Sequence, residues 1–284
     1  MNNEDYVSIL VVVYNKTLEQ SATINTLTKF SFYKRTRLTI YNNGPMEITI
    51  ESKQKKLFNE IFYDSVLIND LNNKPLSLLY NGFIEDNKEA NKVIILDDDT
   101  EITKCFIDAI FSSTADLELP RIISKETGRI YYPMLSGDIS QVDAELDLNS
   151  KFCMSIASGL ILDRKLLNEF YRRELKLFDE RYALYGVDSS FFKRLKMLVR
   201  NGVCFNAKTS CYVRHSLSLT DKEFSEFRFK ERLWDTAIST RCYPSIWQYY
   251  MFFNNFVKLF KYRKVEYFFI LFRGVIRGKH PRCN

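Results

Sequence analysis

Three consecutive aspartates, Asp97, Asp98 and Asp99, follow the apolar run 93–96 and are the side chains best suited to chemistry. A run rich in β-branched residues predicts a buried strand, and ligands of open α/β sheets bind beyond the carboxyl ends of such strands. Acids two residues apart on an extended chain point to the same side, so they can share one divalent cation, which can hold a diphosphate. Alternatively, Asp98, Asp99 and Thr100 could cap a helix beginning near Ile102.

Asp188 and His215 are two further residues that could carry chemistry. Asp188 opens a helical pattern that runs to Arg200, and its position alone favours helix capping. His215 ends a predicted strand over residues 203–215, and a single histidine there is more often an ordinary hydrogen-bonded residue than a metal ligand.

These residues need a sheet to bring them together. Apolar runs predict strands at 7–13, 38–41, 65–68 and 93–96, separated by helical patterns at 18–30 and 76–85. The sequence Asn42-Asn43-Gly44-Pro45 predicts a turn after the second strand. Strands alternating with helices indicate an α/β fold with a mostly parallel, doubly wound sheet. Beyond residue 115 the pattern changes to short strands at 121–124, 129–133 and 158–162.

Composition excludes several classes of protein. The chain has 284 residues, 46% hydrophobic and 27% charged, as expected of a folded protein. Its six cysteines form no CxxC pair and it has two histidines, which argues against a structural zinc site or a disulfide framework and favours reduced thiols in the cytoplasm. We expect no signal peptide before the first strand and no membrane span, because no stretch of about 18 apolar residues occurs.

The positive charge is concentrated in the last part of the chain. Residues 258–284 contain eight basic residues and one acidic residue, so this segment carries +7 and the remainder −1 of the total +6. Its charges alternate with aromatic residues, which is typical of a basic amphipathic helix on an anionic bilayer. Packing onto the main domain is the other interpretation. Nucleic acid is not an expected partner, since no binding motif accompanies the charge.

Six segments, in order, resemble motifs of the inverting GT-A-fold glycosyltransferases of family two. They are VSILVVVYN at 7–15 (the opening strand), IYNNG at 40–44 (a turn), LDDD at 96–99 (the metal-binding DxD), ASGL at 157–160 (beside the donor sugar), FDERYALYGVDSSFFKR at 178–194 (the block with the catalytic base) and VRH at 213–215 (a late histidine). Within the family, the pattern is most similar to rhamnosyltransferase-like enzymes of bacterial surface polysaccharide. The resemblance covers residues 7–217.

The resemblance implies a GT-A fold with a Rossmann-like, mostly parallel central sheet flanked by helices. Residues 1–219 would form the catalytic domain and residues 220–284 a helical, basic and aromatic extension. The implied activity is an inverting, metal-dependent hexosyltransferase, with rhamnosyl transfer as the subgroup's reaction. The donor would be a UDP- or dTDP-sugar, the acceptor a glycan or lipid-linked saccharide in O-antigen or capsule biosynthesis, and the location the inner face of the cell membrane.

The resemblance also implies a role for individual residues. Asp188 would be the general base, and Asp97, Asp99 and His215 would hold Mn²⁺ or Mg²⁺. The donor-binding set comprises Val13, Tyr14, Asn15, Asn42, Lys74, Asn81, Asp97, Asp98, Ser158 and Gly159. Asn42 replaces an aspartate that accepts the pyrimidine N3 proton, and an amide oxygen can still accept it.

One position departs from the family pattern. Val187 stands where the family has a glutamate before the base, so Asp179 or Glu180 would have to supply a second acceptor-binding carboxylate. A catalytically silent binding protein on the same fold therefore remains an alternative. A nucleotidyltransferase is a weaker alternative, because residues 13–18 contain no glycine-rich phosphate loop.

Overall fold

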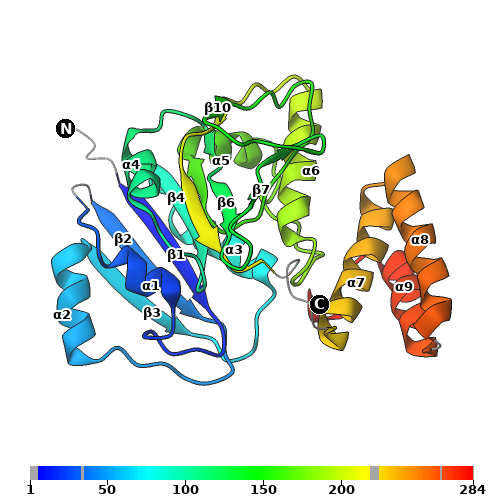
Figure 1. Cartoon of the computed structure of the whole chain (residues 1–284), viewed down its shortest axis with the longest axis horizontal. Coiled ribbons are helices and arrows are strands. Elements are labelled where there is room, and N and C mark those ends of the chain that lie inside the picture. The colour runs from blue at the N-terminus through cyan, green and yellow to red at the C-terminus, as the bar shows by residue number, and fades with distance from the viewer. Residues whose placement is uncertain (1–5, 33–34, 218–223, 263, 284) are drawn as a thin grey trace.

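An eight-stranded sheet forms the centre of the molecule in the computed structural model, which describes residues 6–32, 35–217, 224–262 and 264–283 (Figure 1). The strand order is β10-β13-β5-β12-β4-β1-β2-β3. The strands are β1 (Val7–Val13), β2 (Thr36–Asn42), β3 (Asp64–Asn69), β4 (Lys92–Asp97), β5 (Leu117–Glu118), β10 (Ala144–Glu145), β12 (Leu160–Asp163) and β13 (Ala207–Thr209). Strands β4, β1, β2 and β3 are parallel, whereas β12 runs antiparallel to β4. The predicted α/β fold with a mainly parallel sheet is confirmed.

Helices cover both faces of this sheet, which explains the unbroken apolar sequence of β1. All seven β1 residues are buried. Leu10 and Val12 face the core beneath α3 (Leu76–Asp86), α5 (Arg164–Tyr171) and α6 (Val187–Arg200). Ile9 and Val11 face the opposite core, beneath α1 (Ala22–Leu27), α2 (Ser52–Ile61) and α4 (Lys104–Ser112). A strand buried on both sides has no polar face to alternate with.

Two small sheets lie beside the main one. Strand β14 (Tyr212–His215) pairs with β6 (Arg121–Ser124), which pairs with β7 (Ile130–Tyr132). The other sheet contains β8 (Met134–Leu135), β9 (Asp138–Ile139) and β11 (Cys153–Met154). The single strand expected over residues 203–215 is therefore wrong, because β13 and β14 join different sheets. The expected helix at 18–30 is shorter, since α1 begins after its N-cap Ser21 and ends at Leu27.

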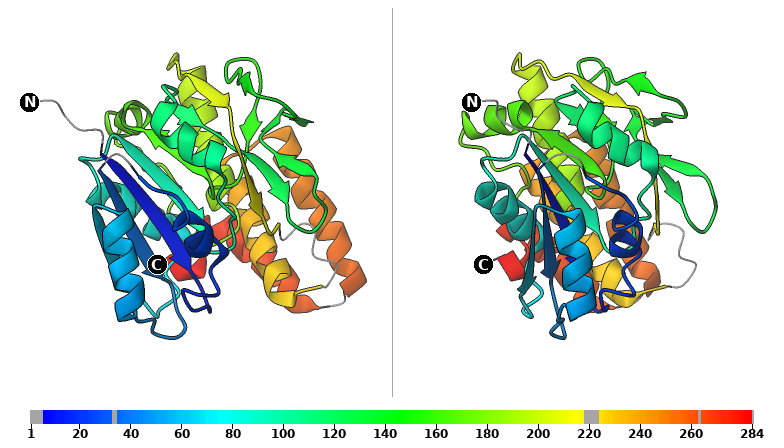
Figure 2. Two further views of the ribbon diagram at one scale, coloured as in Figure 1. Left: turned by 60° about the vertical axis from the view of Figure 1, so that its left-hand side comes forward. Right: turned by 90° about the vertical axis from the view of Figure 1, so that its left-hand side faces the viewer.

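The C-terminal extension is a helical unit beside α6 (Figures 1 and 2). It contains α7 (Glu226–Cys242), α8 (Ile246–Tyr262), α9 (Val265–Arg277) and the short 3₁₀ helix η1 (Pro281–Cys283). The expected boundary at 219/220 lies outside the described residues. Helices α7 and α9 approach closely, because a Cβ at Gly274 would lie 2.5 Å from the Cβ of Ala237.

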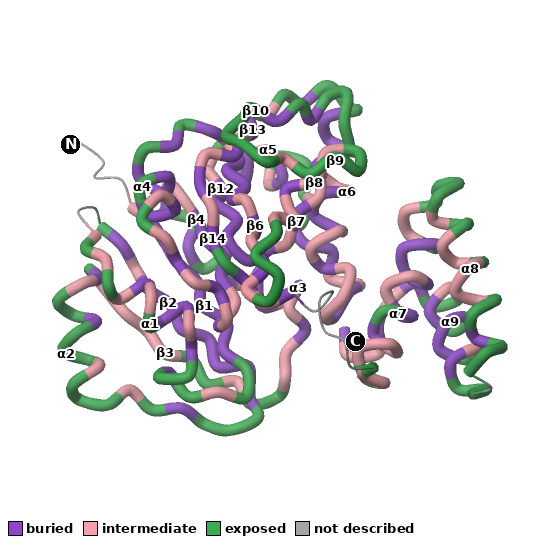
Figure 3. Tube along the Cα trace, in the orientation of Figure 1, coloured by how far each residue is buried: buried purple, intermediate pink, exposed green. Residues whose placement is uncertain are grey.

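The extension shares the main core and also contains many exposed residues (Figure 3), among them large apolar ones. Tyr267 and Leu271 of α9 are buried in the hydrophobic cluster that also contains residues of α3 and α6. One side of α9 therefore packs onto the main domain, as the second interpretation of the sequence expected. Its other side is exposed, as is much of α8. Among the helices of the described residues, none combines the length and apolar character needed to cross a bilayer.

Candidate functional site

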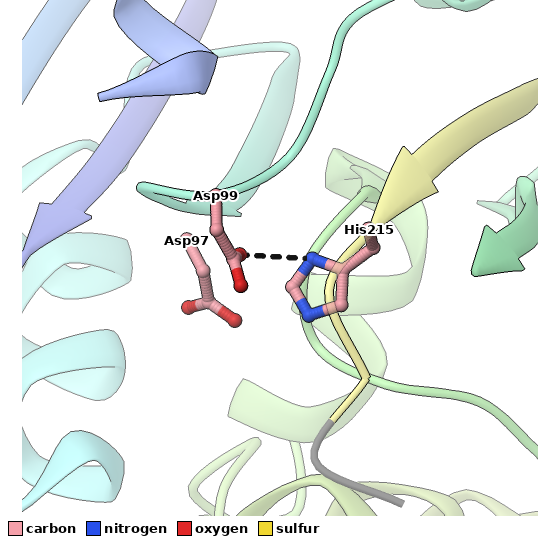
Figure 4. Close-up of side chains that lie close together, drawn as sticks. All are labelled: Asp97, Asp99 and His215. Carbon is pink, nitrogen blue, oxygen red and sulfur yellow. Dashed lines mark ion pairs between the residues drawn. The ribbon is translucent and has the colours of Figure 1, made fainter. Parts of the chain in front are cut away.

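Asp97, Asp99 and His215 meet at the carboxyl end of β4 (Figure 4). One potential ligand atom from each of the three side chains lies within 4.8 Å of the others. The Nδ1 atom of His215 is 3.1 Å from Oδ1 of Asp99. The structure thus groups the three residues for which the sequence suggested a shared cation.

Backbone pairing brings His215 to the acids from more than 100 positions along the chain. Glu101 donates its backbone N–H to Arg214 (2.7 Å) and accepts one in return (3.2 Å). This bridge places the end of β14 beside the segment that follows β4. Thr100 Oγ1 also lies 2.9 Å from Nδ1 of His215, which fixes the ring orientation.

Ser158 and Gly159 are hydrogen-bonded to the end of β4 and to the segment that follows it. Ser158 Oγ accepts the Asp97 backbone N–H (2.9 Å) and is hydrogen-bonded to Thr100 Oγ1 (2.7 Å). Gly159 donates to the Ile95 carbonyl (2.8 Å) with φ +98°, and a Cβ there would lie 2.7 Å from Pro120. Only glycine fits this close approach without strain.

The charges of the cluster favour a cation. Burial, and then the charges of Asp99 and Asp188, raise the pKa of Asp97 well above its usual value. Burial likewise raises the pKa of Asp99 to about 6 and lowers that of His215 to about 4. Asp99 Oδ1 is buried and, apart from its ion-pair contact with His215 Nδ1, accepts no hydrogen bond from any described residue. Two carboxylates and a neutral imidazole are a donor set that suits Mn²⁺ and is compatible with Mg²⁺.

Helix capping does not explain the aspartates. Helix α4 begins at Lys104, and its N-cap is Thr103, whose side chain accepts from Phe106 N–H. Asp98 instead connects β4 to the segment after β1, because its Oδ2 accepts the Tyr14 N–H at 3.1 Å and its other oxygen pairs with Lys16. The capping interpretation of this tripeptide is therefore wrong.

A cleft of about 470 Å³ opens in front of the acids. Tyr14 and Lys16 line one side of it, and Tyr185 lies in the loop before α6. The remaining lining residues are Val12, Asn43, Asn73, Leu76, Asp97, Asp98, Asp99, Ala183, Leu184, Ser216, Leu217, Phe227, Arg228 and Arg282. The last three come from the extension and were not anticipated, since nothing in the local sequence relates them to the aspartates.

Several expected donor-binding residues lie around this cleft without lining it. Val13 is fully buried, Asn15 faces a neighbouring cavity, and Lys74 donates its backbone N–H to Asn43 Oδ1 at 2.8 Å. Asn42 is buried, with its amide donating to Met46 O and Asn69 Oδ1 and accepting from Gly44 N–H. Asn81 binds the backbone of Phe178 and the Glu180 carboxylate. Contacts of these five residues with a donor stay predictions.

Asp188 lies in the first turn of α6, which follows the N-cap Gly186. The Ala157 backbone N–H acts to lower the pKa of its carboxyl, and the N-cap of the helix is Gly186 and not Asp188. Burial raises its pKa to about 7, and the charge of Asp235 acts in the same direction. A carboxyl that changes charge near neutral pH, within electrostatic reach of the acid cluster, is suited to general-base chemistry.

Asp235 of α7 is the carboxylate that the sequence did not suggest. A Cβ at Gly186 would lie 2.5 Å from Asp235 Oδ1, so Asp235 packs against the turn before Asp188. Asp179 is unsuited to acceptor binding, because it is buried and paired with Arg181 and Arg194. Burial would raise the pKa of Asp179, but its hydrogen bond to Arg181 and the charge of Arg194 hold it low.

A second cavity, of about 390 Å³, lies between α6, α7 and α8. Asp235 and Lys193 line it, and Lys193 Nζ donates to Ser239 Oγ at 2.7 Å. Trp247 and Gln248 of α8 form part of another wall, together with the apolar side chains Met134, Phe152, Met154 and Met251. The cavity combines an aromatic surface with hydrogen-bonding groups, as sugar sites do.

Comparison with known proteins identifies the fold. No family model and no curated protein matches the sequence. Among solved structures, TarS of S. aureus is 16% identical with a TM-score of 0.51, over 83% of this chain and 40% of that one. Its 1–349 form in complex with UDP-GlcNAc is 14% identical with a TM-score of 0.51, over 80% and 64%. GalNAc-T7 with UDP, GalNAc and Mn²⁺ is 14% identical with a TM-score of 0.52, over 85% and 51%.

These similar structures are GT-A-like glycosyltransferases, and the chain shares their fold. At such identities the likeness concerns the fold alone. The chain also spans only 40% of the length of TarS and about half of GalNAc-T7.

Proposed function

We propose that this protein is an inverting, metal-dependent glycosyltransferase that uses a UDP- or dTDP-sugar. The observation that carries the proposal is the grouping of Asp97, Asp99 and His215 at the carboxyl end of β4, beside a cleft that the two aspartates line, with Asp188 nearby. The same place in an α/β sheet is where ligands bind. The complexes of similar folds with UDP, UDP-GlcNAc and Mn²⁺ support the same ligand class.

Each residue has a distinct role in the proposed reaction. Asp97, Asp99 and His215 would hold Mn²⁺ or Mg²⁺, which when bound supplies Lewis-acid neutralisation of the leaving nucleoside diphosphate. Asp188 would take the proton from the acceptor hydroxyl as its oxygen attacks the anomeric carbon opposite the leaving group. A single displacement of this kind inverts the configuration.

The acceptor would occupy the second cavity. Its polar residues Asp235, Lys193 and Gln248 can hydrogen-bond sugar hydroxyls, and Trp247 offers a ring for stacking. Asp235 would take the place of the glutamate that Val187 replaces. The proposed acceptor is a glycan or lipid-linked saccharide of O-antigen or capsule biosynthesis, and rhamnose is the sugar that the sequence motifs favour.

The exposed side of the extension would contact the inner face of the cell membrane. Its apolar side chains are accompanied by the positive charge of residues 258–284. Such a surface would hold the enzyme near a lipid-linked acceptor.

A panel of UDP-, dTDP- and GDP-sugars, with and without Mn²⁺ or Mg²⁺, tests the activity by release of nucleoside diphosphate. We expect Asp99→Ala to lower turnover by at least about 100-fold, since Lewis-acid stabilisation is worth several kcal/mol. Its melting temperature should not fall, because the change removes repulsion between Asp97 and Asp99. Full activity in chelator would contradict the metal role, and nucleotide-sugar binding without any turnover would favour the catalytically silent alternative.

A further inference from the structure

The end of the chain returns from the extension to the cleft. Helix α9 ends at Arg277, its C-cap Gly278 has φ +64°, and the backbone N–H of His280 donates to the Arg181 carbonyl at 2.9 Å. The His280 ring packs edge-on against Trp234, with Nε2 3.2 Å from Glu231 Oε1. These contacts join the last described residues both to α7 and to the loop before α6.

Arg282 is held in the wall of the cleft by this arrangement. Its contacts with protein acceptors are long, with one terminal nitrogen 3.4 Å from Asn73 O and the other 3.5 Å from Glu231 Oε2. Its Nε atom is buried and donates to no described residue. A guanidinium has five N–H donors, and leaving a buried one unused is unfavourable. The two terminal nitrogens, whose contacts are at the limit of a hydrogen bond, therefore keep donor capacity for a ligand in the cleft.

The surroundings of Arg282 indicate an anionic ligand. Lys16, which pairs with Asp98, and Arg228 line the same cleft, so three distant parts of the chain each contribute a positively charged side chain. The aspartates of the cleft would share their charge with a divalent cation. With that cation bound, the cleft would present positive charge around a space large enough for a diphosphate, and a guanidinium can bind phosphate oxygens in a bidentate manner.

We propose that Arg282 binds a phosphate of a diphosphate ester in the cleft, and that this ester is the nucleoside diphosphate of the donor. The proposal rests on the proposed function and extends it, because it makes the C-terminal segment part of the donor site. The alternative is a purely structural role, in which Arg282 only connects Glu231 to the loop at Asn73.

The test compares Arg282→Gln with Arg277→Gln, a matched loss of one positive charge at an exposed position of α9. Affinities for UDP, UMP and uridine, and for dTDP and thymidine, are measured by calorimetry with Mn²⁺ present. We expect Arg282→Gln to weaken diphosphate binding about tenfold or more, the size expected for a hydrogen bond to a charged group. Nucleoside binding should not change. Arg282→Lys should restore part of the affinity, and Arg277→Gln should match the wild type.

A structural role predicts a different pattern. In that case Arg282→Gln would have a lower melting temperature, and its affinities for nucleosides and for nucleoside diphosphates would fall to the same extent. This result would overturn the proposal. Unchanged nucleotide affinity with a raised KM for a diphosphate-linked acceptor, compared with a neutral glycan, would assign the phosphate to the acceptor and overturn the donor assignment. Failure of the wild type to bind any nucleotide would instead reject the proposed function itself.

Discussion

Asp188 illustrates how the surroundings of one residue set its chemistry. Its sequence position suits a capping residue, but Gly186 occupies the N-cap and the Asp188 carboxyl is partly buried near two other acids. Burial favours the neutral form of a carboxyl, so its pKa rises to about 7. The residue therefore gains its charge in the pH range where a base is useful.

We predict that the rate at saturating donor and acceptor rises with pH through about 7, as Asp188 loses its proton. A bound metal ion nearby would favour the ionised carboxylate, so the rise in rate would then occur at lower pH. Asp188→Asn should keep donor affinity while turnover falls about 100-fold or more, the range for loss of a general base. A pH–rate profile of both proteins, with donor binding measured in parallel, checks this.

A variant with near wild-type turnover, or one that retains the same acidic limb, would return Asp188 to a structural role. The metal-site variant Asp99→Ala serves as the comparison, because it should lose metal dependence while Asp188 stays intact.

At the level of elements, the contact between α6 and α7 forms one side of the cavity that we propose for the acceptor. Gly186 has φ +86°, and a Cβ there would meet the Tyr182 ring at 2.3 Å and Asp235 at 2.5 Å. Gly202 also has φ +86°, but a Cβ there would meet nothing within 4 Å. An alanine at either position would therefore suffer the same backbone strain, but only an alanine at 186 would also clash with neighbouring side chains.

We predict that Gly186→Ala raises the KM for acceptor and lowers the free energy of unfolding more than Gly202→Ala does. Both changes cost about 1–2 kcal/mol for a left-handed residue, and Gly186→Ala adds the displacement of Tyr182 or Asp235. Denaturant unfolding and acceptor kinetics of the two variants provide the measurement. Equal effects of the two changes would show that the α6–α7 contact is not critical.

Most strands and helices of the main sheet could be predicted from the sequence. Which strands pair with one another could not. Strands β1 and β4 are continuous apolar runs because both of their faces are buried, and that pattern is local. Helix α2 escaped prediction, since of its residues only Phe58 is buried and no apolar stripe results. The split between β13 and β14 depends on which strand each one pairs with, which is a property of the tertiary structure.

In the molecule as a whole, some residues of the site could be predicted from local sequence, and others depend on tertiary packing. The acids and His215 could be proposed together because they resemble known motifs in order. Arg228, Asp235 and Arg282 could not, because they reach the site only through the packing of the extension. Removing residues 258–284 would therefore remove Arg282 from the cleft, so the membrane role has to be tested with surface substitutions.

The exposed side of the extension carries two apolar stripes at helical spacing. On α8 they are Ile246, Tyr250, Phe253, Val257 and Phe260, and on α9 they are Val265, Phe269, Phe272 and Ile276. Ring contacts connect the two helices, since Phe268 and Phe256 lie between exposed Phe260 and Phe272. Basic Arg273 and Arg277 are exposed on the same α9 helix. A continuous aromatic surface beside positive charge suits an anionic bilayer surface.

We predict that the full chain sediments with anionic vesicles at low salt and is released as salt rises. Phe269→Gln with Ile276→Gln removes side chains that are 70% and 79% exposed, and should reduce binding without lowering the melting temperature. Replacing Arg273 and Arg277 by Gln should weaken binding roughly 30-fold, at about 1 kcal/mol per charge. The control replaces Met46 and Tyr63, both 65% exposed on the main domain.

The apolar and the basic substitutions in the extension both lie outside the cleft. Transfer to a soluble acceptor should therefore persist in these variants while transfer to a membrane-embedded acceptor falls. Equal vesicle binding by all variants would reject the membrane role, and dimers that these substitutions dissociate would assign the surface to a second copy of the chain.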